Sequence, residues 1–315
     1  MAIHNSPMVG NAWDLVDLRV FCQVARRSSF VAAATDLGIS PAYVTKRVAG
    51  LEKALGVKLF HRTTRRVLIS DEGEAAYAWA RKVLEAADEL SQGLSGARSE
   101  PTGALRISTS LRLGRNHIAP ILAKMNQAYP ALEIWLELLD RRVDLLGEGF
   151  DIDVRMGEVN EPHLVGHLVA HNARVLCAAP AYLARRGHPN TLADLAGHDC
   201  LMYRERHQTF GVWRMTGPNG PESVKVTGSM GSNQADIVRE WALDGLGIIP
   251  LASWDVARDL KEGSLVRVLP AYQQNADVWA VTATRLDQSA KLRVCLPLLI
   301  GELQHGAHAL DTSIR

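Results

Sequence analysis

Seven side chains near the start of the chain could hydrogen-bond nucleic acid, and they form two groups. Tyr43, Thr45, Lys46 and Arg47 follow Ser40 and Pro41, and Arg62, Arg65 and Arg66 come soon after. A threonine hydroxyl can bond a base edge, whereas lysine and arginine donate to guanine or to phosphate. The residue types do not decide between base and phosphate contacts, but they predict a DNA-binding surface.

The first group is positioned by a predicted helix that begins at Ser40. A capping hydroxyl followed by proline is a strong start signal, because proline fits the first helical position. Val44, Val48, Leu51 and Leu55 are spaced by four, three and four residues and form the buried stripe. The four polar residues of the first group lie off that stripe.

Earlier residues predict the partner helices. Asp14 caps an apolar-periodic segment, an alanine-rich segment covers 30–37, and Gly38 begins a tight turn. Two helices joined by a glycine-containing turn, the second one basic, form the arrangement that reads a DNA major groove.

The second group lies at the tip of a predicted two-stranded wing over 58–70. Leu59, Phe60, Val67 and Ile69 can pack this wing on the helices, which leaves the arginines for a phosphate backbone or a narrow minor groove. The alternative is a solvated charged hairpin. Because the wing directly follows a capped basic helix, we favour DNA binding over a solvated hairpin.

Charge is distributed unevenly along the chain. Residues 1–70 hold ten Lys and Arg against four Asp and Glu, whereas the whole chain carries a formal charge of only +1. A basic N-terminal segment on a nearly neutral protein is expected where one end meets phosphate. The four cysteines are far apart and predict buried thiols in a reducing compartment. No apolar run is long enough for a membrane span, so we expect a cytoplasmic protein that contacts no membrane.

Residues 71–98 predict a long helix. Ala76, Ala80, Val83, Ala87, Leu90 and Leu94 recur with heptad spacing. That spacing favours a seam between two copies of the helix, and hence a homodimer. An amphipathic helix packed on its own domain is the alternative. A hinge over 99–103 follows, and it separates the winged helix-turn-helix (13–70) from a C-terminal domain over 104–305.

The C-terminal domain alternates strand-like and helical segments, which predicts an α/β fold with mostly parallel sheets. Strands are expected at 105–108, 132–138 and 173–178. Helices are expected at 116–128, 180–186, 234–244 and 290–302. A segment of this length can form two lobes with a cleft between them.

Residues 13–73 resemble the winged helix-turn-helix of the LysR-type transcriptional regulators. The matching motifs are Ser29-Phe30-x-x-Ala33-Ala34-x-x-Leu37-Gly38-Ile39-Ser40, Val44-Thr45-Lys46-Arg47-Val48-x-x-Leu51-Glu52-x-x-Leu55-Gly56, and Leu59-Phe60-x-Arg62-Thr63-Thr64-Arg65-Arg66. Many members have arginine then glutamine where this chain has Lys46-Arg47. The resemblance therefore implies binding of promoter or operator DNA without implying a base preference.

The resemblance continues less densely through Cys177–Ala184, Leu192–Cys200 and Gly245–Ile248. It implies a two-lobed effector domain similar to periplasmic solute-binding proteins, and assembly into homotetramers from two dimers. By position in that fold, the effector-contacting residues would be Thr109, Ser110, Leu111, Arg112, Asp140, Ser229, Ser232, Asn233, Gly247 and Ile248.

Arg112 stands where small hydroxyl residues are common in the family. An arginine facing a cleft suggests a carboxylate ligand held by two parallel hydrogen bonds, and the alternative is a surface arginine paired with a nearby acid. The run Asp140–Asp151 resembles a subgroup that includes regulators of hydroxy-dicarboxylate metabolism. We therefore expect an organic-acid or dicarboxylate effector, bound between the two lobes, that shifts the population of lobe arrangements.

Enzymatic motifs are not apparent, and we predict no catalytic residue, metal or cofactor. His163, His167 and His171 recur every four residues, but Pro162 and Gly166 make a metal-binding helix face doubtful. A remaining alternative is an architectural DNA-binding protein without effector control. The large α/β domain argues against it, because groove binding alone does not require one.

Overall fold

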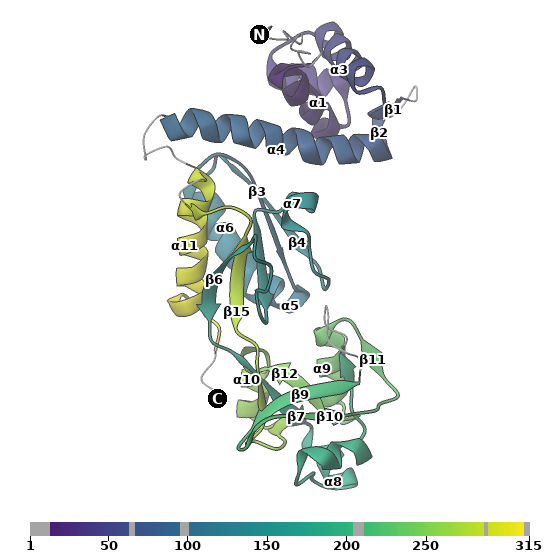
Figure 1. Ribbon diagram of the computed structural model, residues 1–315, viewed down its shortest axis with the longest axis vertical. Coiled ribbons are helices and arrows are strands. Elements are labelled where there is room, and N and C mark those ends of the chain that lie inside the picture. Colours follow the sequence, from purple (N-terminus) through teal and green to yellow (C-terminus); the bar gives the residue numbers. More distant parts are fainter. Residues whose placement is uncertain (1–12, 63–66, 95–100, 204–210, 287–288, 312–315) are drawn as a thin grey trace, which may run out of the picture. The chain divides into compact units, whose positions relative to one another are not determined.

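The structure is a computed structural model that describes residues 13–62, 67–94, 101–203, 211–286 and 289–311 (Figure 1). These residues divide into an N-terminal unit, drawn from 1–99 with 147–149, and a C-terminal unit, drawn from 100–146 and 150–315. No helix in the described ranges is long and apolar enough to cross a membrane.

The N-terminal unit is a winged helix-turn-helix followed by a long helix. Its elements are α1 (Leu15–Arg27), α2 (Phe30–Leu37), α3 (Pro41–Leu55), β1 (Phe60–Arg62), β2 (Val67–Ile69) and α4 (Asp71–Leu94). Asp14 and Asp17 form a reciprocal cap at the start of α1, each carboxylate accepting the other residue's backbone N–H at 2.9 Å. Gly38 ends α2 at φ +67°, a left-handed conformation that glycine adopts without strain.

An aromatic cluster joins the wing to the helices. Phe60 of β1 packs edge-to-face on Phe21 and Phe30, with ring centroids 5.5 and 5.7 Å away. Val44, Val48 and Leu51 of α3 are fully buried in the same core. The predicted buried stripe is therefore confirmed as far as Leu51, whereas Leu55 at the end of α3 is 40% exposed.

The long helix α4 has two different halves. Ala80 is buried in the core of the N-terminal unit, with Ala76 and Tyr77 packed against that core. Further along, Val83 and Leu90 are 37% and 67% exposed. The first half thus matches the alternative of a helix packed on its own domain, and the second half leaves an apolar edge uncovered.

The C-terminal unit has two lobes, each built on one main sheet. Lobe I has strand order β4-β3-β5-β15-β6 and lobe II has β10-β9-β14-β7-β12, with β13 also paired to β7.

The elements of lobe I are β3 (Gly103–Thr109), α5 (Leu111–Leu113), the π-helical turn η1 (Gly114–Ile118), α6 (Ala119–Ala128), β4 (Leu132–Leu138), α7 (Leu145–Glu148), β5 (Ile152–Met156), β6 (Val165–Ala170), β15 (Val278–Thr282) and α11 (Ala290–His305). Those of lobe II are β7 (Ala173–Ala178), α8 (Pro180–Arg186), the 3-10 helix η2 (Leu192–Gly197), β8 (Met202–Tyr203), β9 (Val212–Gly217), β10 (Gly220–Lys225), β11 (Gly231–Ser232), α9 (Ala235–Leu243), β12 (Ile249–Ala252), α10 (Ser253–Glu262), β13 (Val266–Arg267) and β14 (Gln273–Asn275).

The expectation of mostly parallel sheets is wrong for lobe II. Within its main sheet every strand pair is antiparallel, and in lobe I β15 pairs antiparallel with both β5 and β6. Among the described strands, β4-β3-β5 and the short pair β8-β11 are parallel, and an isolated parallel bridge joins Cys200 to Ile248. Two features account for this: β9 and β10 form a hairpin, and the chain passes between the lobes through β6–β7 and returns through β14–β15.

The helix expected over 116–128 begins earlier and contains a π-helical turn at Gly114–Ile118. Pro120 follows that turn and has no N–H to donate to the carbonyl four residues back, so the regular hydrogen-bond ladder is interrupted there. The turn places His117 edge-to-face with Trp254 of α10, with ring centroids 5.2 Å apart. Trp254 is 7% exposed and belongs to the core cluster of lobe I, although α10 follows a lobe II strand.

Candidate DNA interface and effector site

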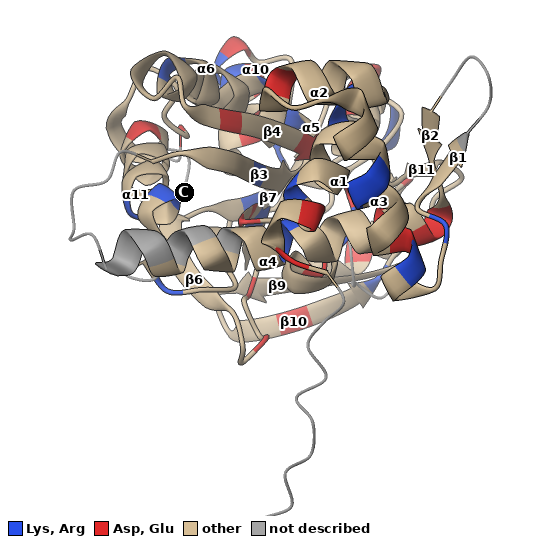
Figure 2. Cartoon of the chain, turned by 90° about the horizontal axis from the view of Figure 1, so that it is seen from above, with Lys and Arg blue, Asp and Glu red and all other residues tan. Residues whose placement is uncertain are grey.

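The predicted DNA-reading residues of α3 lie on the surface of the N-terminal unit. The Ser40 hydroxyl accepts the Tyr43 backbone N–H at 3.2 Å, and Pro41 takes the first helical position, as predicted. Tyr43 is 42% exposed and Lys46 is exposed. The Thr45 hydroxyl donates to the Pro41 carbonyl at 3.0 Å, which leaves its oxygen able to accept from a base. Cationic and anionic residues both occur along α1 and α3 (Figure 2).

Arg47 departs from the predicted role of a groove-facing cation. Its Nη2 lies 2.6 Å from Asp14 Oδ1 and its Nε 2.9 Å from Asp17 Oδ1, so the guanidinium holds α3 against the capped start of α1. The hydrogen bond that Arg47 donates to Asp14 raises the pKa of Arg47, against a smaller opposing effect of burial. The guanidinium also lies 5.6 Å from the centre of the Tyr43 ring. Arg47 therefore orients α3 and leaves Lys46 as the exposed cation of that turn.

The buried carboxylate of Glu52 ties the wing to α3. Glu52 belongs to the recognition-helix motif, but this role was not predicted from the sequence. Glu52 accepts the backbone N–H of Leu59 at 3.0 Å and the ammonium of Lys58 at 2.7 Å. Burial disfavours its charge, but these donors outweigh burial and lower the pKa of Glu52. Arg62 lies in β1, as predicted, whereas Arg65 and Arg66 lie outside the described residues.

In the C-terminal unit, Arg112 is paired with two acids, and its side chain is 14% exposed. Its Nη1 lies 2.6 Å from Asp236 Oδ1 of α9, and its Nε bonds Asp255 of α10. Burial disfavours the charged guanidinium, but these two carboxylates outweigh it and raise the pKa of Arg112. The structure agrees with the pairing in the alternative prediction, although Arg112 is largely buried rather than at the surface. Because α5 belongs to lobe I and α9 and α10 to lobe II, we call this set of three residues the Arg112 clasp.

The other predicted effector residues differ in accessibility. Thr109 is fully buried and donates to the Val154 carbonyl at 2.8 Å. Partly or fully exposed positions are Ser110, Leu111, Asp140, Ser229, Ser232 and Asn233.

Gly247 and Ile248 serve the packing of lobe II. Ile248 is fully buried in the core, and a Cβ at Gly247 would meet the Asp199 carbonyl oxygen at 2.4 Å. Both positions argue against the prediction that Gly247 and Ile248 contact an effector.

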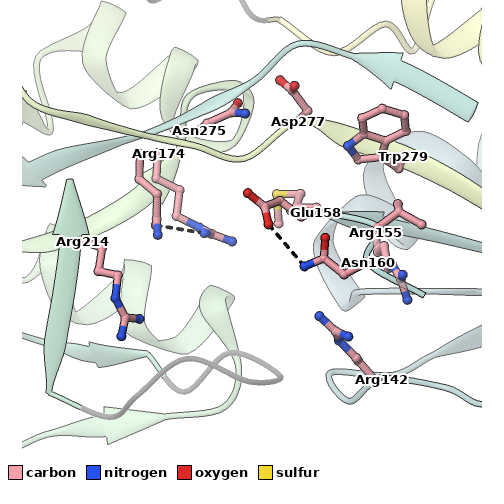
Figure 3. Close-up of a pocket in the computed structure, with 13 residues that line it drawn as sticks. Arg142, Arg155, Glu158, Asn160, Arg174, Arg214, Asn275, Asp277 and Trp279 are labelled. Atoms are coloured by element: carbon pink, nitrogen blue, oxygen red, sulfur yellow. Dashed lines mark hydrogen bonds between the residues drawn. The ribbon is translucent and has the colours of Figure 1, made fainter. Parts of the chain in front are cut away.

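A pocket of about 500 Å³ lies elsewhere in the C-terminal unit, lined by residues that were not predicted as a site (Figure 3). Four arginines line it: Arg142 and Arg155 from lobe I, and Arg174 and Arg214 from lobe II. The remaining lining residues are Met156, Gly157, Glu158, Val159, Asn160, Gln274, Asn275, Asp277 and Trp279. One sequence signal could have indicated the pocket, namely an arginine inside the otherwise buried strand Ile152–Met156.

The cysteines are buried and free, as predicted. Burial raises the pKa of Cys177, Cys200 and Cys295 to about 12, so these thiols stay protonated and unreactive at neutral pH. His167 lies in β6 rather than on a helix. In the part of the chain that the structure describes, no three His, Cys, Asp or Glu residues gather as metal ligands.

Comparison with known proteins agrees with this architecture. Residues 15–74 match the model of the bacterial regulatory helix-turn-helix protein, lysR family, and residues 98–304 match the LysR substrate binding domain. The HTH-type transcriptional regulator DmlR of Escherichia coli K12 is 47% identical over 285 residues, which cover 90% of this chain and 93% of DmlR. The HTH-type transcriptional activator TtdR of the same strain is 40% identical over 290 residues, with 92% and 94% covered.

A solved structure also matches over nearly the full length. CrgA, a LysR-type transcriptional regulator from Neisseria meningitidis, aligns with a TM-score of 0.58 and 28% identity, covering 92% of this chain and 99% of CrgA. The chain therefore belongs to the LysR family of transcriptional regulators, with a DNA-binding helix-turn-helix followed by an effector-binding domain.

Proposed function

We propose that this protein is a sequence-specific regulator of transcription without catalytic activity. In this proposal α3 and the wing bind operator DNA, and an organic acid is the effector that controls the regulator. The proposal of DNA binding rests on one observation: helix α3, which is capped by Ser40, lies at the surface with Tyr43 and Lys46 exposed. The residues proposed to contact DNA are Ser40, Pro41, Tyr43, Thr45, Lys46, Arg62, Arg65 and Arg66. Binding chromosomal DNA requires a cytoplasmic location, which we also propose.

The uncovered edge of α4 supports a homodimer. Val83 and Leu90 follow the heptad spacing and are exposed within the described chain. Burying such residues against a second copy would bring two DNA-binding units to successive half-sites, which raises affinity beyond that of one unit. Pairing of two dimers into a tetramer is proposed from the family alone.

An organic acid is the effector class that the residues favour. The resemblance of 140–151 to regulators of hydroxy-dicarboxylate metabolism suggests it. The arginines that line the pocket of the C-terminal unit independently suit carboxylate groups.

The test is fluorescence anisotropy of the full-length protein on the DNA upstream of its own gene, at fixed salt, with and without malate, tartrate or an aromatic acid. We expect saturable, sequence-dependent binding that one of the diacids changes. Absence of binding to any promoter fragment would contradict a regulator. Binding that no acid alters, together with no thermal stabilisation by any acid, would favour an architectural protein instead.

A further inference from the structure

The arginine pocket combines charge from both lobes. Arg142 and Arg155 come from lobe I and Arg174 and Arg214 from lobe II, and in Figure 3 the two pairs lie on opposite sides with Glu158 between them. The lining holds two carboxylates, Glu158 and Asp277, against these four cations. Behind the lining, Glu161 and Asp153 offset part of this charge at Arg142 and Arg155, so it is the excess of cations at the pocket surface that favours an anionic ligand.

Arg155 is the most unusual of the four. Its side chain is 3% exposed, yet its Nε and Nη1 have no hydrogen-bond acceptor among the described residues. Only Nη2 is hydrogen-bonded, to Glu161 at 2.6 Å, while Asp153 lies 3.6 Å from Nη1. Buried donors without acceptors are costly, and because Nε and Nη1 are themselves buried, a ligand oxygen would relieve this deficit once the guanidinium turns toward the pocket.

The other arginines are held in place around the pocket. Glu161 also accepts from Arg142 at 3.0 Å, which fixes Arg142 beside Arg155. Arg174 is 5% exposed and donates to Gln274 at 3.0 Å. Trp279 and Met156 add apolar surface between the charged groups. A ligand with two anionic ends and a short carbon chain matches this combination.

We propose that this pocket binds a short dicarboxylate, with one carboxylate on Arg155 and Arg142 of lobe I and the other on Arg174 and Arg214 of lobe II. The inference rests on the proposed control by an organic acid and places it at residues different from those predicted by position. A ligand that joins the lobes binds most tightly to one arrangement of them. It therefore shifts the population toward that arrangement, which is the requirement for an effector.

The experiment is isothermal titration of the full-length protein with succinate and tartrate, and with butyrate and sulfate as probes carrying one carboxylate and none. Arg142→Gln and Arg214→Gln remove one arginine from each lobe's pair. Arg155 is left intact because it also holds Asp153 and Glu161. Arg258→Gln is the matched control, since Arg258 is an exposed arginine of α10 outside the pocket.

We expect a diacid to bind the wild type and the control equally, and each pocket variant to weaken binding by about tenfold or more. We also expect Arg214→Gln to erase the preference for succinate over butyrate. Diacid binding that neither pocket variant weakens would overturn this site and leave organic-acid control intact. Binding of sulfate alone, or of no acid by a protein that still binds its operator, would overturn both.

Discussion

At the scale of single residues, two neighbours on α3 have opposite roles. Lys46 is exposed, whereas Arg47 is held by Asp14 and Asp17 of the α1 cap. In the sequence the two residues look equivalent, because both are cations that lie off the buried stripe. No local pattern reveals that Arg47 meets two carboxylates some thirty positions earlier, since that contact depends on how α1 and α3 pack.

Replacing Lys46 by alanine should therefore weaken operator binding with little effect on folding. If Lys46 contacts a base, we expect the binding free energy to fall by about 1–3 kcal/mol. If it contacts phosphate, we expect the slope of log affinity against log salt concentration to decrease in magnitude by about one. Anisotropy across a salt series measures both, with Lys261→Ala of lobe II as control. Arg47→Ala should instead lower the melting temperature as well as the affinity. An unchanged affinity of Lys46→Ala would remove Lys46 from the interface.

Glu52 predicts a pH dependence of the N-terminal unit. Its pKa is lowered below the usual 4.5 by Lys58 and the backbone of the wing, which outweigh burial. The folded state therefore binds protons less readily than the unfolded state. The stabilisation is present above pH 4.5 and is lost as pH falls through the lowered pKa.

In Glu52→Gln this dependence should disappear. We expect the variant to be about 1–2 kcal/mol less stable near neutral pH, because a neutral amide accepts more weakly from Lys58 and the backbone. The difference should shrink in acid, as measured by urea unfolding at several pH values. Parallel profiles for the two proteins would show that Glu52 does not titrate with folding.

At the level of helices and strands, an element is predictable from sequence where its own residues mark its start and its end. The helix expected at 180–186 has those bounds, and α3 begins at its predicted cap. The helix α10 was not predicted, because its buried face includes Asp255 and Asp259 and therefore lacks a continuous apolar stripe. The arginine pocket was missed for a related reason: its lining runs from Arg142 to Trp279, so folding alone brings these residues together.

The second half of α4 carries a prediction about assembly. Leu90→Glu puts a charge on the exposed seam and should shift the protein from dimer toward monomer, with weaker operator binding. Light scattering coupled to size-exclusion chromatography measures the mass. Ala75→Glu introduces the same charge at an exposed position of α4 outside the seam and should leave the mass unchanged. A dimer that persists in Leu90→Glu would place the interface elsewhere.

At the scale of the whole C-terminal unit, the Arg112 clasp joins the two lobes through charge. Arg112→Met would leave Asp255 buried without its cation, and losing one partner of a buried pair costs about 3–5 kcal/mol. Burial raises the pKa of Asp255. Removing the cation raises that pKa further, so the variant should lose more stability than the wild type as pH rises through it.

Thermal unfolding of the full-length protein at several pH values tests this. Arg112→Met with Asp255→Asn should recover part of the loss, because the amide needs no counter-charge. If Arg112→Met abolishes the response to acids at undiminished melting temperature, the arginine serves the ligand rather than the lobes.

The indole of Trp254 limits how such a protein can move. Trp254 extends from lobe II into the core of lobe I, beside His117. Separating lobe I from lobe II would expose this ring to water. At roughly 25 cal/mol per Å² of apolar surface, exposing an aromatic side chain costs about 4 kcal/mol. The free energy that couples ligand binding to a conformational change is typically about 1–3 kcal/mol, which is less than this cost. We therefore expect the effector to cause a small rotation of the two lobes about Trp254, which stays buried, rather than a wide separation of the lobes. A small rotation of this kind produces a larger displacement at residues far from Trp254.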